Sequence, residues 1–189
     1  MLGRSFLLLL VACQGESTSS KVPVRPAIEV RDPAGVVVAR VVGGHPCRAT
    51  IEGHELIVGG RPLVAQYGSA RWTGQDAANG VTLAKNDQPV ARIHAKQLFD
   101  AEGVPLLRVM DNGDVASGAG RIVRKIVRTP DGSLSIVPNE AGGDTLTVSG
   151  MPSTPDDIAL AAMLTAHEAS PEVRALAACH YLLHDETKG

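Results

Sequence analysis

Short apolar runs separated by turn residues dominate the chain from residue 27 to residue 148. Val and Ile are frequent in these runs, and in several of them apolar and polar positions alternate, as in QPVARIHAK at 88–96. The breaks contain Gly, Asp, Asn or Pro, and two of them, DNGD at 111–114 and PDGS at 130–133, carry the Asn-Gly or Asp-Gly pair of tight hairpins. The pattern predicts about ten strands in antiparallel hairpins. No helical period separates the runs, so a parallel α/β sheet is not expected.

The end of the chain has a helical pattern instead. The segment STPDDIALAAMLTAH at 153–167 begins with Thr154 in the capping position and Pro155 in the first turn, which predicts a helix over about 155–167. This helix is apolar on nearly every side, so it is expected to be buried on every side.

A second helix start follows directly. Ser170 in the capping position and Pro171 in the first turn predict a helix over about 171–184. Its apolar residues form one stripe that leaves Glu172 and Arg174 to the side, a pattern typical of packing against a sheet. The fold class predicted from these elements is mainly β, an antiparallel hairpin-rich sheet or barrel with two C-terminal helices, the first largely buried. A β-sandwich or an open sheet with both helices on one face fits the same pattern.

One turn sequence occurs twice. DPAGV at 32–36 and DAEGV at 100–104 share Asp, Gly and Val at identical spacing. The match is consistent with an internal duplication, but any strand–turn–strand unit can produce it, because Asp and Gly are general turn residues.

The first residues differ from the rest of the chain. Arg4 is followed by the apolar run FLLLLVA at 6–12, which is far shorter than the roughly 20 residues of a membrane-spanning helix. A positive start, a short apolar run and small residues are the layout of a secretory signal peptide. The alternative is a buried first element of the domain.

LVAC at 10–13 resembles the lipobox of bacterial lipoproteins. The resemblance implies cleavage between Ala12 and Cys13 and a covalent diacylglyceryl lipid on Cys13, which holds the protein at a membrane. The domains expected are a signal peptide at 1–12, the lipidated cysteine with a flexible tether at 13–26, and one β-rich domain at 27–189. Gln14, where an Asp would favour retention, favours the outer membrane if the organism is Gram-negative.

Many antiparallel strands followed by an apolar helix resemble the tubby-like fold, which includes the LURP-one-related proteins and phospholipid scramblases. The resemblance covers residues 27–184 and rests on the hairpin series, the DxxGV turns and DDIALAAMLTAH at 156–167. It implies a closed barrel around a hydrophobic C-terminal helix, and lipid binding as the activity. The second helix and an aromatic content of only 3% depart from that family.

The charge composition of the chain argues against nucleic acid as a partner. The chain has 18 Lys and Arg against 20 Asp and Glu, a formal net charge of −2, so no basic face for nucleic acid is expected. RIVRKIVR at 121–128 is the exception. Its four cations, Arg121, Arg124, Lys125 and Arg128, could meet anionic lipid head groups, or they could form the solvated face of one strand.

Two cysteines remain beside Cys13. An envelope compartment permits a disulfide between Cys47 and Cys179, and two buried thiols are the alternative. The only tryptophan, Trp72, is either an exposed platform or a core residue.

The late histidines are the candidates for metal chemistry. His180 and His184 in CHYLLH are four residues apart on the second helix, so both imidazoles could reach one metal. The plainer interpretation is that His180 is a core residue and that His184 is a cation at the end of the helix. HELIV at 54–58 lacks the second histidine of a zinc-protease motif, and no serine-nucleophile motif is present in the sequence.

The function expected from the sequence is a membrane-anchored lipoprotein of the cell envelope with a non-enzymatic binding or structural β domain. Its partners are the membrane, through the anchor, and an envelope protein or a lipid. No cofactor is predicted apart from the covalent lipid. The alternatives are a metal-dependent enzyme that uses the late histidines and a lipid-binding tubby-like domain.

Overall fold

A computed structural model describes residues 27–151, 154 and 156–185, with side chains up to residue 183. Ala12, Cys13 and the expected tether lie outside the described residues. The predicted fold class is confirmed: one antiparallel sheet of fourteen strands is followed by two C-terminal helices.

The sheet is a meander, in which strands that follow one another in the chain also lie side by side. Its order is β4-β3-β2-β1-β14-β13-β12-β11-β10-β9-β8-β7-β6-β5, so β1 and β14 are the only neighbours far apart in sequence. The strands are β1 (Ile28–Arg31), β2 (Val37–Val42), β3 (Cys47–Ile51), β4 (His54–Val58), β5 (Leu63–Tyr67), β6 (Ala70–Ala77), β7 (Gly80–Lys85), β8 (Gln88–His94), β9 (Gln97–Asp100), β10 (Pro105–Val109), β11 (Asp114–Ser117), β12 (Ile122–Arg128), β13 (Leu134–Pro138) and β14 (Leu146–Ser149).

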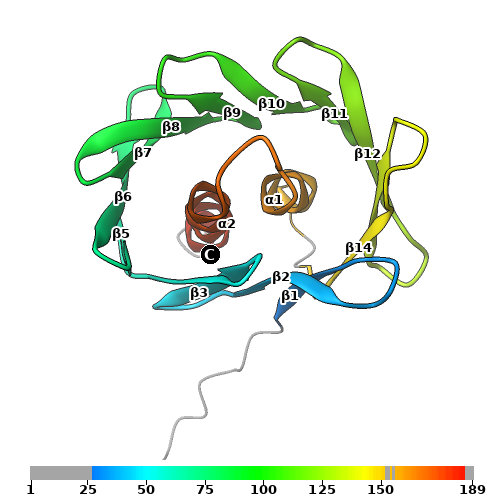
Figure 1. Ribbon diagram of the computed structural model, residues 1–189, viewed down its shortest axis with the longest axis horizontal. Helices are drawn as coiled ribbons and strands as arrows, with labels where there is room; N and C mark the ends of the chain where they lie inside the picture. The colour runs from blue at the N-terminus through cyan, green and yellow to red at the C-terminus, as the bar shows by residue number, and fades with distance from the viewer. Residues whose placement is uncertain (1–26, 152–153, 155, 186–189) are drawn as a thin grey trace, which may run out of the picture.

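The sheet curls until its two edge strands, β4 and β5, meet. The Gly59 and Val64 backbones exchange two hydrogen bonds of 2.9 and 3.0 Å between N and O atoms, and the His54 and Tyr67 rings stack with centroids 5.1 Å apart. The result is a nearly closed barrel (Figure 1). This closure leaves little exposed edge, which limits pairing with other chains.

Both helices lie inside the barrel. Figure 1 looks along α1 (Asp157–Leu164) and α2 (Pro171–Asp185), and the strands surround both of them. Side chains alternate along the strands, so that in β3 Cys47, Ala49 and Ile51 are fully buried while the residues between them are exposed. The inward side chains of the wall pack against the helices to form the core.

The expectation of about ten strands was too low, and β6 and β11 show why. In β6 three consecutive residues, Trp72, Thr73 and Gly74, are buried, so the alternation that marks a strand is absent. The strand β11 has only four residues.

Helix α1 is shorter than predicted. Its N-cap is Asp156 rather than Thr154, and it ends at Leu164 rather than at residue 167. The Thr165 hydroxyl donates to the Ala161 carbonyl at 2.9 Å, and the backbone turns away there. The prediction that α1 is buried on all sides is correct, since every residue from Ala159 to Leu164 is at most 2% exposed.

Helix α2 is more buried than its stripe predicted. Ser170 caps it, with the Val173 amide donating to the Ser170 hydroxyl at 3.4 Å. The expectation that Arg174 and Glu172 lie away from the packed side was wrong, because they are only 3% and 9% exposed. The barrel encloses the helix on all sides. The polar side chains of the helix must therefore form hydrogen bonds or ion pairs inside the barrel.

The repeated turn has one geometry. In both the 32–36 and 100–104 turns the Asp carboxylate accepts a hydrogen bond from the Val amide four residues on, at 2.8 and 2.7 Å. Gly35 and Gly103 have φ of +82° and +84°, a backbone conformation that favours glycine. Three other hairpins, at 110–114, 117–121 and 129–133, use the same backbone hydrogen bonds, so the likeness reflects a recurring turn type.

A disulfide joins the inner helix to the wall. Cys47 on β3 and Cys179 on α2 are bonded, 132 residues apart in sequence. Among the described helices, neither is long and apolar enough to be a candidate membrane span.

Loss of this disulfide is expected to destabilise the protein. Replacing both Cys47 and Cys179 by Ala frees a long loop in the unfolded chain, so the free energy of unfolding should fall by roughly 2–5 kcal/mol. Urea unfolding of the oxidised protein, the reduced protein and the double variant measures the difference. If the reduced protein and the double variant both unfold at the same urea midpoint as the oxidised protein, the disulfide bond is contradicted.

Candidate functional site

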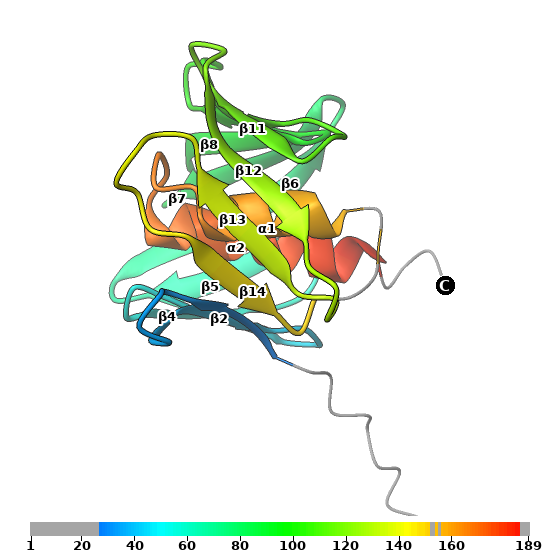
Figure 2. The ribbon, with the colours of Figure 1, turned by 90° about the vertical axis from the view of Figure 1, so that its right-hand side faces the viewer.

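The barrel has two ends, and the described chain starts and finishes at the same one. The start of β1 and the end of α2 lie together, as does the start of α1 (Figure 2). The opposite end holds the α1–α2 connection, where Arg174 of α2 reaches Glu52 in the β3–β4 turn.

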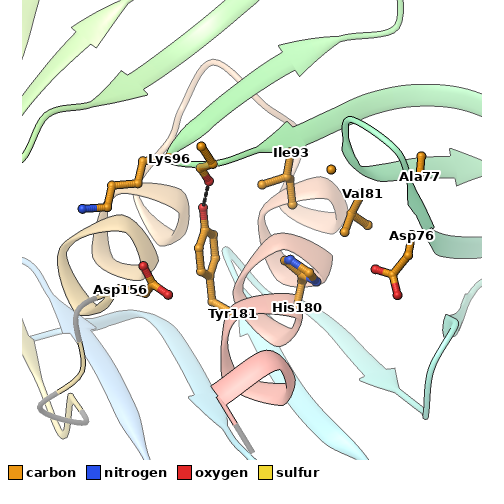
Figure 3. Close-up of a pocket in the computed structure, with 10 residues that line it drawn as sticks. Asp76, Ala77, Val81, Ile93, Lys96, Asp156, His180 and Tyr181 are labelled. Carbon is orange, nitrogen blue, oxygen red and sulfur yellow. Dashed lines mark hydrogen bonds between the residues drawn. The ribbon is translucent and has the colours of Figure 1, made fainter. Parts of the chain in front are cut away.

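A cavity of about 590 Å³ opens beside α2 at the end where the described chain starts and finishes; we call it the Tyr181 pocket (Figure 3). Three parts of the chain build it: the β6–β7 hairpin, the β8–β9 turn, and the two helices. Its lining residues are Asp76, Ala77, Gly80, Val81, Ile93, Ala95, Lys96, Asp156, His180 and Tyr181. This volume is in the range of small-molecule sites.

Tyr181 fixes one wall of the pocket. Its hydroxyl donates to the Ala95 carbonyl at 2.8 Å and so ties α2 to the β8–β9 turn. Burial raises the pKa of Tyr181 well above its ordinary value, and the nearby Asp156 carboxylate raises it further. The phenol therefore stays protonated at physiological pH and acts as a neutral donor. The His180 ring lies edge-on to it, with centroids 5.7 Å apart.

Charged groups surround an apolar floor. Val81 and Ile93 are buried on the strand side of the pocket, whereas Asp156 and Lys96 lie on the Tyr181 side and Asp76 on the His180 side (Figure 3). The Lys96 ammonium is already paired with Asp111 at 2.8 Å. Apolar contact with Val81 and Ile93, and hydrogen-bonding groups on either side, suit the binding of a small amphipathic molecule.

Gly80 shapes this pocket. A Cβ at position 80 would collide with the Ile93 carbonyl, and the φ of Gly80 is +105°, so a larger residue cannot occupy the position without moving the β7–β8 pair.

Of the two candidate metal ligands, the structure places His180 at the Tyr181 pocket. The His184 side chain lies outside the described side chains, so their pairing stays a prediction. Among the described residues, no group of three His, Cys, Asp or Glu is arranged to hold a metal ion.

The HELIV segment is strand β4, and its histidine has a structural partner. His54 Nδ1 lies 2.9 Å from the Glu172 carboxylate of α2. Burial by itself raises the pKa of Glu172, but hydrogen bonds from its own amide, from His54 and from Ser170 outweigh burial and lower it. The His54–Glu172 pair fixes the start of α2 beside the edge strand.

The four cations of the segment 121–128, which contains β12, do not share one outward face. Arg124 is inside the barrel, 9% exposed, where it binds both carboxylate oxygens of Glu168 at 2.6 and 2.9 Å. Arg128 pairs with the buried Asp157 at the start of α1. Lys125 and Arg121 are exposed. The interpretation of this segment as one solvated or lipid-facing basic surface therefore does not describe Arg124, which is buried, whereas Arg128 is exposed as well as paired.

Two buried arginines close the carboxyl end of α1. Arg124 donates to the Thr165 carbonyl, and Arg174 donates to the Leu164 carbonyl at 2.6 and 3.1 Å. Arg174 also donates to Glu52 at 2.6 Å, and this bond, more than the charge alone, lowers the pKa of Glu52. Helix-end carbonyls need such partners, and cations suit the negative end of the helix dipole.

Sequence reasoning identified few members of the Tyr181 pocket. Of its lining residues only His180 was singled out beforehand, because the others come from two neighbouring hairpins of the wall and from the two helices, which meet only in the folded barrel. Trp72 is a core residue, 4% exposed, rather than an exposed platform.

Comparison with known proteins gives no relative: no protein-family model, no curated protein sequence and no solved structure matches this chain.

Removal of Arg174 should destabilise the barrel strongly. Arg174→Met leaves the buried Leu164 carbonyl without its donor, and an unsatisfied buried acceptor costs roughly 1–3 kcal/mol of unfolding free energy. The matched control is Arg121→Met, whose exposed pair with Glu140 is worth about 1 kcal/mol or less. Urea unfolding measures the free energy of unfolding of both variants. Equal losses in the two variants would contradict the role of Arg174.

The Glu52 carboxylate gives the same contact a pH dependence. Its pKa is lower in the folded protein than in the unfolded chain, so the stabilisation is present above the ordinary value of 4.5. It is lost as the pH falls through the folded pKa. Below pH 4.5 the wild type should lose stability more steeply than the Arg174→Met variant. If the free energy of unfolding of the wild type and of the variant falls in parallel with pH, this coupling is contradicted.

Proposed function

We propose that this chain is a lipoprotein of the bacterial cell envelope, anchored by lipid on Cys13, whose barrel is a non-enzymatic binding domain. The proposal combines the lipobox at 10–13 with the architecture of the domain. Its partners are the membrane, through the anchor, and a lipid or an envelope protein.

The disulfide between Cys47 and Cys179 is the observation that carries the proposal. Disulfides form and persist in oxidising compartments and are rare in the cytosol, so the bond supports export. It is also a structural bond, since it holds an enclosed helix against the wall and both cysteines are fully buried.

The position of the Tyr181 pocket supports a binding role near a membrane. The pocket lies at the end where β1 begins, so a tether that precedes β1 would attach at the same end of the barrel. Fourteen residues, 13–26, reach at most about 50 Å when extended, which keeps the domain near the lipid surface. With Gln14 after the modified cysteine, the anchor would lie in the outer membrane if the organism is Gram-negative.

A tubby-like relationship is part of the proposal for lipid binding. The apolar helix α1 inside a nearly closed barrel supports it, because an enclosed hydrophobic helix is what the resemblance implies. The second enclosed helix, α2, departs from it.

Metabolic labelling tests the anchor. When the full gene is expressed with radiolabelled palmitate, the wild-type protein should incorporate label and partition with membranes. Cys13→Ser should abolish both, because the thiol is the site of attachment. Equal labelling of the two proteins, or an intact Met1 on purified wild-type protein, would exclude a lipoprotein.

Thiol trapping tests the compartment. In the exported protein Cys47 and Cys179 should resist a maleimide until a reductant is added, because they form a disulfide. A chain that starts after residue 12 stays in the cytosol and should have both thiols reactive once unfolded. Free thiols in the full-length protein, trapped in intact cells, would argue against export.

A further inference from the structure

The Tyr181 pocket carries two carboxylates on opposite sides. Asp76, near the end of β6, lies on the His180 side of the pocket, and Asp156, the N-cap residue of α1, lies on the Tyr181 side (Figure 3). Neither carboxylate has an ion-pair or hydrogen-bond partner among the residues that the structure describes. One cavity therefore has an unneutralised negative charge at each of two sides.

The cation of this pocket is already in use. Lys96 is the only Lys or Arg among the described lining residues, and its ammonium lies 2.8 Å from the carboxylate of Asp111. In Figure 3 the Lys96 side chain points away from the Tyr181 ring. The pocket thus has an excess of negative charge, and a cleft of one sign concentrates ligands of the opposite sign.

Apolar surface lies between the two carboxylates. Val81 and Ile93 are only 4% and 2% exposed, and in Figure 3 they lie on the strand side of the pocket, between Asp156 and Asp76. Methylene groups that leave water for such a surface are stabilised. The Tyr181 ring, close enough to Asp156 for that charge to raise its pKa, adds an aromatic surface that attracts a cation.

The second cavity of the barrel has no such pair of carboxylates. It has a volume of about 440 Å³ and lies at the opposite end, next to the α1–α2 connection; we call it the Trp72 cavity. Two of its three carboxylates are engaged by basic side chains, because Glu168 binds Arg124 and Glu172 pairs with His54. Two carboxylates without a basic partner therefore distinguish the Tyr181 pocket from this cavity.

We propose that the Tyr181 pocket binds a linear aliphatic diamine, with one ammonium at Asp156 and the other at Asp76. The methylene chain lies along Val81 and Ile93, and the ammonium at Asp156 also contacts the Tyr181 ring. Charge-assisted hydrogen bonds are about twice as strong as neutral ones, so two ammonium groups are preferred over two hydroxyl groups. The assignment rests on the proposal that the barrel is a binding domain, and it does not depend on the lipid anchor.

An NMR titration with cadaverine, a diamine of five carbons, tests the site. The protein is the full-length chain with Cys13→Ser, which cannot take a lipid there. Signals of residues 76–81, 93–96 and 180–181 should shift and saturate. Pentylamine, with one ammonium, should bind roughly threefold more weakly or worse, because one ion pair is lost, and pentanediol should bind more weakly still. Added salt should weaken cadaverine binding, because these charges are near the surface.

Variants separate the two ends of the ligand. Asp76→Asn and Asp156→Asn should each weaken cadaverine binding roughly threefold or more and reduce its advantage over pentylamine, since only one ion pair remains. Asn is favoured at a helix N-cap, so Asp156→Asn retains the start of α1. The matched control, Asp87→Asn, removes an exposed carboxylate in the β7–β8 turn, at the other end of the strands, and should leave the affinity unchanged. Circular dichroism of each variant verifies that the fold is retained.

The opposite results overturn the proposal. Absence of saturable shifts at these residues with millimolar cadaverine excludes the site, as does equal binding of pentylamine and cadaverine. If Asp76→Asn and Asp87→Asn bind cadaverine equally, the diamine does not lie between the two carboxylates. Failure here leaves the palmitate labelling of Cys13 unaffected, so the result is distinguishable from a failure of the lipoprotein proposal.

Discussion

The structure depends on how the end of an enclosed helix is satisfied. Helix α1 is buried on every side, and its last carbonyls have no water to bind. Arg124 and Arg174 reach these carbonyls from the wall and from α2, and their charges are balanced by Glu168 and Glu52. A hydrophobic helix can occupy the centre of this barrel only because both arginines are themselves buried and paired.

The same constraint explains which parts of the fold were predictable. Apolar alternation identified most strands, and a helix that is apolar all round, such as Ile158 to Ala166, could only be a buried one. Arg174 could not be assigned to the interior, because its surroundings are set by a turn at Glu52, more than a hundred residues away in sequence. The strand β6 escaped detection because consecutive buried residues have no period of two.

The candidate sites were harder to predict for the same reason. The Tyr181 pocket and the Trp72 cavity each combine short pieces of several strands with residues of the helices. The strand pieces are neighbours in the meander, but the helix residues reach them only when α1 and α2 lie inside the barrel, which local sequence does not encode. The turn residues could be read directly, since Gly35 and Gly103 mark positions where φ must be positive.

The two cavities lie at opposite ends of the barrel. The end where β1 begins carries the Tyr181 pocket, and the anchor that we propose would attach there. The other end carries Trp72, Lys85 and the α1–α2 connection, and it would face away from the attachment point. The disulfide and the buried arginines between them hold both helices in a fixed position, which gives each cavity a defined wall.

Hydrogen exchange tests the enclosed helices most directly. If α1 and α2 form the centre of the core, their amides open only with global unfolding, and peptides covering 157–183 should exchange slowest in the protein. The edge strands β4 and β5, joined by one backbone bridge, should exchange sooner. Helix amides that exchange faster than those of the strands would contradict an enclosed position for the two helices.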